Sequence, residues 1–122
     1  MAKATKTKKP KSRVLVIDED IDSLKKLYIG LLQLQFDVEA SDQVNEIIQR
    51  INRFKPAVVV MAQEFVDNEP NLYKNIKQIY HLPIIRLVQS LDKGSGEEDF
   101  VSKPVRINEI AEKIRQVTRK KK

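Results

Sequence analysis

Three stretches of the chain are almost entirely apolar and rich in β-branched residues, which is typical of strands buried on both faces of a sheet. They span residues 13–17, 55–62 and 84–88. The middle stretch is predicted as the central strand. Residues 36–40 alternate apolar and polar, which indicates an edge or half-buried strand, and residues 100–102 are predicted as a short fifth strand.

Four segments between these strands space their apolar residues three and four positions apart, as amphipathic helices do. Asp20 or Asp22 is predicted to cap the first helix. Residues 63–71 are predicted as an acidic loop. The predicted apolar stripes are Ile21, Leu24, Leu27, Tyr28, Leu31 and Leu32; Val44, Ile47, Ile48, Ile51 and Phe54; Leu72, Ile76, Ile79 and Tyr80; and Ile107, Ile110, Ala111, Ile114 and Val117.

This alternation of strands and helices predicts an α/β fold with a parallel sheet, right-handed crossovers and helices on both faces. In such sheets the functional site lies beyond the carboxyl ends of the strands, where the strand order reverses. The predicted strand ends place Asp18, Glu19, Ala62, Val88 and Lys103 around one crevice.

Four motifs at these strand ends carry a resemblance to a known family. The motifs are residues 14–19 (VLVIDE), 55–62 (KPAVVVMA), 82–85 (LPII) and 101–104 (VSKP). Together they resemble the receiver domain of bacterial two-component response regulators, over about residues 13–118. The resemblance implies a flavodoxin-like, doubly wound sheet of five parallel strands in the order 2-1-3-4-5.

The resemblance also implies a chemistry for the crevice. Receivers accept a phosphoryl group on an aspartate that ends the third strand, beside a divalent cation held by two acids after the first strand. Asp18 and Glu19 match that acidic pair, Lys103 matches the phosphoryl-binding lysine, and Phe100 matches the aromatic residue of the fifth strand.

Two positions depart from this pattern. Ala62 stands at the phosphoacceptor position and Val88 stands where the family has a serine or threonine. A methyl group cannot accept a phosphoryl group, and Glu64 lies two residues too far along the chain to replace the aspartate. The sequence therefore predicts a degenerate receiver, or pseudo-receiver, with no catalytic residue.

The remaining matched residues have a simpler interpretation. Asp18 and Glu19 are interpreted as a vestigial acidic pocket paired with Lys103, in preference to a metal site, so we expect no cofactor and no bound Mg²⁺. Phe100 suits the core as well as a switch. By resemblance, Pro104 is a candidate cis proline.

The segment before the fifth strand is shorter than the family pattern. Residues 89–98 are polar and carry no helical stripe, so the fourth helix is predicted to be short or missing. Arg86 in the fourth strand is then expected to reach water or the acids at residues 97–99. We therefore predict an interaction surface around Arg86, Phe100 and Pro104.

Positive charge is concentrated at the two ends of the chain. The net charge is +6, and residues 1–13 alone account for +6, whereas residues 14–118 carry −4. Residues 1–12 are predicted as a disordered basic tail and residues 119–122 as a second basic tail. We favour a solvated tail over an electrostatic arm because no aromatic residue lies among the lysines, which include Lys6, Lys8, Lys9 and Lys11.

The amino-acid composition excludes several classes of protein. The chain has no cysteine and no apolar run of about 20 residues, so we expect no disulfide, no membrane span and a cytoplasmic location. The sequence predicts a non-enzymatic, phosphorylation-independent signalling module that binds an unidentified protein partner, with a protein of a two-component pathway as a candidate. The alternative is a nucleic-acid or anionic-surface binder that uses the lysine-rich tails.

Overall fold

The computed structural model describes residues 12–88, 99–103 and 105–119. Its elements, in chain order, are β1 (Arg13–Ile17), α1 (Ile21–Gln33), β2 (Asp37–Ser41), the 3₁₀ helix η2 (Val44–Glu46), α2 (Ile47–Phe54), β3 (Val58–Ala62), α3 (Gln63–Asn68), α4 (Pro70–Gln78), β4 (Ile84–Val88), β5 (Asp99–Ser102) and α5 (Ile107–Arg119). The strands form one parallel sheet in the order β2-β1-β3-β4-β5, which confirms the predicted topology.

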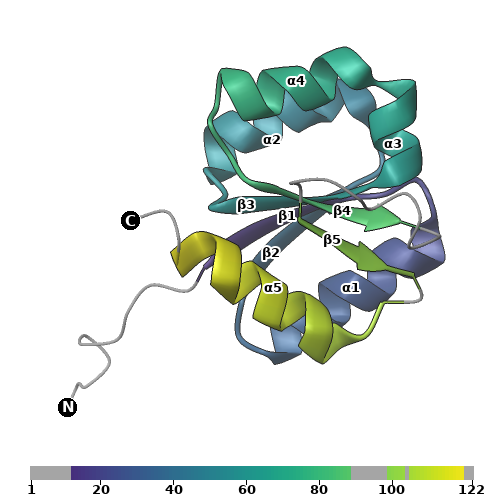
Figure 1. Cartoon of the computed structure of the whole chain (residues 1–122), viewed down its shortest axis with the longest axis vertical. Helices are drawn as coiled ribbons and strands as arrows, with labels where there is room; N and C mark the ends of the chain where they lie inside the picture. Colours follow the sequence, from purple (N-terminus) through teal and green to yellow (C-terminus); the bar gives the residue numbers. More distant parts are fainter. Residues whose placement is uncertain (1–11, 89–98, 104, 120–122) are drawn as a thin grey trace.

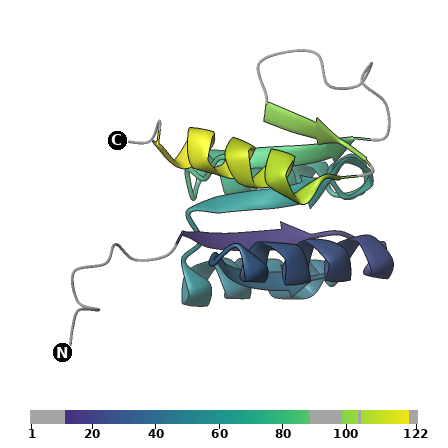
Figure 2. The ribbon, with the colours of Figure 1, turned by 90° about the horizontal axis from the view of Figure 1, so that it is seen from below.

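Helices cover both faces of this sheet. Figures 1 and 2 show α1 and α5 on one face and α2, α3 and α4 on the other. Each face has its own apolar core, because successive residues of a strand point to opposite sides. All five residues of β3 are buried, and this strand lies between β1 and β4. Its continuous apolar sequence is therefore explained by burial on both faces.

Helix α1 begins at a side-chain cap. Asp20 is the N-cap residue, and its carboxylate accepts hydrogen bonds from the backbone N–H groups of Asp22 and Ser23. The helix then packs closely on α5, since a Cβ at Gly30 would lie 2.5 Å from Cδ1 of Ile107. A larger residue at position 30 would therefore force the side chain of Ile107 to move.

The predicted apolar stripe of α1 was partly wrong. Leu24, Leu27 and Leu31 are buried as expected. Ile21, Tyr28 and Leu32 are exposed, at 44%, 38% and 42%, although the same spacing had assigned them to the core. The physical reason is that α1 lies mainly over β2, which is the edge strand of the sheet, so no further strand lies beneath this side of the helix.

Three other sequence predictions need correction. The acidic loop expected at residues 63–71 instead contains α3, whose Phe65 packs into the core. It also contains the start of α4 at Pro70, a position where the N–H that proline lacks would have no partner within the helix. Ile79 lies beyond the last residue of α4 and is 63% exposed. Val44 belongs to η2, ahead of α2, and is 43% exposed.

An ion-pair network joins α2 to the edge strand. Nη1 of Arg50 lies 2.9 Å from Oε1 of Glu39 in β2, and Nη2 lies 3.1 Å from Oε1 of Glu46. Burial acts to lower the pKa of Arg50, but its hydrogen bonds to Glu39 and Glu46 outweigh burial and raise it. The guanidinium therefore stays charged and balances two carboxylates.

Some predictions concern residues outside the described part of the chain. The short or missing fourth helix falls on residues 89–98, and the predicted tails, residues 1–12 and 119–122, lie outside the described residues except for Ser12 and Arg119, so these stay predictions. Arg119, predicted as the first residue of the second tail, instead ends helix α5. Within residues 12–88, 99–103 and 105–119, no helix is both long enough and apolar enough to cross a membrane.

The cap of α1 gives a first test. Replacing Asp20 with Ala removes the acceptor for two backbone N–H groups, and we expect the free energy of unfolding to fall by about 1 kcal/mol. Asp20→Asn keeps a capping oxygen and should stay close to the wild type. Urea unfolding followed by circular dichroism measures both. Equal loss in the two variants would contradict the capping role.

Candidate functional site

The carboxyl ends of the strands meet at one edge of the sheet. Asp18 follows β1, Ala62 ends β3, Val88 ends β4 and Lys103 follows β5. Lys103 is anchored there by its own backbone N–H, which donates to the carbonyl oxygen of Val88 at 2.8 Å. Parallel pairing therefore brings residues from four distant parts of the sequence to one place.

A buried ion pair occupies this edge. Nζ of Lys103 lies 3.0 Å from Oδ2 of Asp18, and the two side chains are 11% and 3% exposed. The other carboxylate oxygen of Asp18 accepts the backbone N–H of Asp20 at 3.0 Å. The backbone N–H of Asp18 donates to the carbonyl oxygen of Ser41 at 3.3 Å. Both oxygens of Asp18 are thus satisfied, and the pair joins β1 to β5 across 85 residues of sequence.

The third strand brings no charged group to the site. Ala62 is 1% exposed and belongs to the apolar core formed with α2, α3 and α4. Val88, at the end of β4, is fully buried. A carboxylate and a hydroxyl are therefore absent from the two positions where the resemblance would place them.

A small cavity of about 170 Å³ lies at the strand ends, lined by Asp18, Glu19, Asp20, Glu64 and Lys103. Glu64 is the unexpected member. Sequence reasoning placed it in a loop, too far along to take part, but it lies in the first turn of α3 and reaches the same cavity as the acidic pair. The apolar Phe65 and the helix-starting Pro70 are the sequence features that could have indicated α3 and so placed Glu64 at the cavity.

A cation at this cavity would compete with Lys103 for the carboxylate of Asp18. Magnesium binding in proteins usually combines one or two carboxylates with substrate phosphates. Here the most buried carboxylate, Asp18, already accepts from Lys103 and from the backbone of Asp20. Among the residues that the structure describes, no group of three His, Cys, Asp or Glu side chains is placed to hold a metal.

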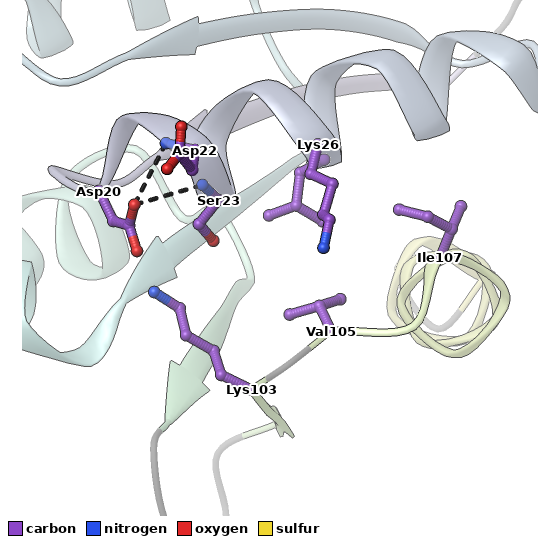
Figure 3. Close-up of a pocket in the computed structure, with 8 residues that line it drawn as sticks. Asp20, Asp22, Ser23, Lys26, Lys103, Val105 and Ile107 are labelled. Atoms are coloured by element: carbon purple, nitrogen blue, oxygen red, sulfur yellow. Dashed lines mark hydrogen bonds between the residues drawn. The ribbon is translucent and has the colours of Figure 1, made fainter.

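A larger cavity of about 360 Å³ adjoins the ion pair between α1 and the start of α5, as Figure 3 shows. Its polar side is formed by Asp20, Ser23 and the amines of Lys26 and Lys103. Its apolar side includes Val105 and Ile107. The strand ends are therefore open to solvent on the α1 and α5 side.

Arg86 lies on the opposite face of the sheet, and its partner differs from the expected one. Nη1 of Arg86 donates to Oε1 of Gln63 at 2.8 Å, and Nε2 of Gln63 donates to Oδ1 of Asp67 at 2.9 Å. The acids at residues 97 and 98 lie outside the described part of the chain. Sequence reasoning missed Gln63 because nothing in the local pattern links two polar residues on different elements.

The rest of the predicted interaction surface is described in part. Phe100 is half-buried on β5, where it lies beside Arg86 in the strand register. Near it, Nε of Arg86 and Oγ of Ser102 are buried and have no hydrogen-bond partner among the described residues. Pro104 falls outside the described residues, so its cis peptide bond stays a prediction.

The ion pair gives the second test. Lys103→Met leaves the carboxylate of Asp18 buried without its cation, and we expect the free energy of unfolding to fall by about 3 kcal/mol. Asp18→Asn in the same chain removes the stranded charge and should recover part of that loss. Lys26→Met is the matched control, since Lys26 is exposed beside the same cavity, and its change should stay within about 0.5 kcal/mol. A double variant no more stable than Lys103→Met would contradict the pairing.

Comparison with known proteins identifies related sequences. No protein-family model matches the chain. The transcriptional regulatory protein CpxR homolog of Haemophilus influenzae is 27% identical over 117 residues, which cover 89% of this chain and 51% of that protein. The response regulator protein GraR of Staphylococcus saprophyticus is 24% identical over 115 residues, with coverage of 88% and 51%. The chain spans about half the length of the curated relatives it matches.

Solved structures share the fold. A response regulator from Thermotoga maritima matches with a TM-score of 0.76 and 20% identity, over 89% of this chain and 98% of that one. A CheY-like response regulator receiver domain from Methanospirillum hungatei matches with a TM-score of 0.73 and 20% identity, over 91% and 96%. The sequence relatives and the shared fold together support a CheY-like receiver domain of the response regulator type.

Proposed function

We propose that this chain is a pseudo-receiver, a signalling module that binds a protein partner without accepting a phosphoryl group. The observation that carries the proposal is Ala62, a buried methyl group at the end of β3. Val88 supports it, because the group that would follow a bound phosphoryl group is also missing. We also propose a cytoplasmic location, in keeping with a sequence that has no cysteine.

The charge balance of the site agrees with this proposal. In the described residues, Lys103 pairs directly with Asp18, and each oxygen of Asp18 already has one partner. A phosphoryl group would need both an acceptor carboxylate and a lysine that is available to bind its oxygens. The pocket instead holds a closed pair that stabilises the strand ends.

Partner binding is proposed to use the β5 edge of the sheet, on the face opposite α5. Phe100 is half-buried there beside Arg86, so part of an aromatic side chain is exposed at this edge. A partner of a two-component pathway is one candidate.

Phosphoryl transfer is tested directly with acetyl phosphate and Mg²⁺. We expect intact-mass spectrometry to find no added phosphoryl group, and the amide spectrum to keep its peaks for Asp18, Glu19 and Lys103. A phosphorylatable receiver in the same tube is the control for the reagent. A mass increase would refute the proposal, and its loss in Glu64→Gln would identify Glu64 as a displaced acceptor.

The choice between a protein partner and a nucleic acid is tested by removing the tails. Deleting residues 1–11 and 120–122 spares Ser12, whose carbonyl oxygen accepts from the N–H of Asp37, and Arg119, which ends α5. We expect crosslinking from native cells to capture the same protein with either form. Capture lost with the tails, together with tail-dependent nucleic-acid binding that falls steeply with salt, would favour the electrostatic alternative.

A further inference from the structure

An apolar stripe on α1 is left without a described neighbour. Four of the six large apolar side chains that are exposed in the described residues lie on this one helix: Ile21, Tyr28, Ile29 and Leu32. Ile21, Tyr28 and Leu32 are seven and four positions apart, so they share one side of the helix. Exposed apolar side chains gathered on one side of a helix are typical of an interaction site, and here Lys25 lies among them.

The stripe continues onto the edge of the sheet. A groove of about 370 Å³ lies beside it, lined by Leu24, Lys25, Tyr28, Val38, Glu39, Ala40 and Arg50. Val38 and Ala40 belong to β2, which pairs only with β1 and so has one open edge. The exposed side of α1 and the open edge of β2 are therefore parts of one surface.

The backbone of β2 is ready to accept another strand. The N–H of Asp37 donates to the carbonyl oxygen of Ser12, and the carbonyl oxygen of Ser41 accepts from the N–H of Asp18. These groups point toward β1. Because backbone groups alternate along a strand, Val38 and Ala40 direct their N–H and C=O groups to the open edge. An edge of this kind is a template for pairing with a second chain.

We propose that the occupant is a second copy of this chain, with the two β2 strands paired antiparallel about a two-fold axis at Glu39. Val38 and Ala40 are the immediate neighbours of Glu39 on either side. An axis through Glu39 therefore places Val38 of one copy opposite Ala40 of the other, and their outward backbone groups bond in pairs. Two-fold dimers of this self-complementary kind are the commonest oligomers.

Charge complementarity favours a second copy over a partner of one strong sign. The groove carries Lys25 and Arg50 beside Glu39, and Asp37 begins the strand, so this surface has as many acids as bases. Glu39 would face Glu39 of the second copy, which is unfavourable for like charges. Arg50 offsets that cost, because it already holds Glu39 at 2.9 Å in each copy.

Sedimentation equilibrium of the full-length chain tests the dimer. We expect the mass to rise to twice that of the monomer as the concentration approaches the millimolar range. Ala40→Pro removes an outward N–H without removing a bond to β1, and it should weaken the dimer about tenfold or more. Tyr28→Lys places a charge in the stripe and should weaken it as well. Ile79→Lys is the matched control, since Ile79 is exposed outside this surface.

The register has its own test. Glu39→Gln removes the facing like charges while keeping an oxygen for Arg50, so we expect the dimer to tighten. Weaker or unchanged association of this variant would overturn the proposed axis. A wild-type chain that stays monomeric at millimolar concentration would overturn the dimer. The dimer would also be overturned if the Ala40→Pro and Tyr28→Lys chains are folded by circular dichroism and associate as tightly as the wild type.

Discussion

Burial of β3 on both faces is the constraint on which the rest of the structure depends. Each of its five residues is buried, and the strands on either side align with it in parallel. This burial fixes where the strands end and so where a site can form. Ala62 completes the apolar core at that point and packs in the same cluster as Phe65. Burying a carboxylate there would require compensating partners, and the methyl group needs none.

With an alanine at position 62, the neighbouring charges pair with each other. Lys103 and Asp18 form a buried pair at 3.0 Å, with the second oxygen of Asp18 held by a backbone N–H. Such a pair is costly to break from one side, because the remaining charge is stranded in the interior. Residues that the resemblance assigns to phosphoryl chemistry therefore have a sufficient structural reason to be present.

The sequence predicted the sheet well because its signal is local. β1 and β4 match the predicted spans, the parallel arrangement followed from the alternation of strands and helices, and the strand order was implied by the resemblance. Helix faces were predicted less well. Spacing identifies which residues of α1 lie on one side, but burial of Tyr28 and Leu32 depends on whether an element lies beneath them, and the sheet ends there.

The candidate site was also predicted only in part. Asp18 and Lys103 were placed together by topology alone, and the structure finds them in contact. Glu64 was missed because α3 has too few residues to show a helical period. The contact between Arg86 and Gln63 was missed for a different reason: it joins two elements through side chains, and no sequence pattern reports such a contact.

The two proposed surfaces lie at opposite edges of one sheet, and this separation makes them compatible. β2 is one edge strand and β5 is the other. A second copy paired through β2 would extend the sheet on that side and leave β5, with Phe100, uncovered. Each copy in such a dimer would still offer its β5 edge to a partner. A chain without phosphoryl chemistry would then present two partner sites in a fixed relative orientation, and binding at both would raise the avidity for a partner that is itself dimeric.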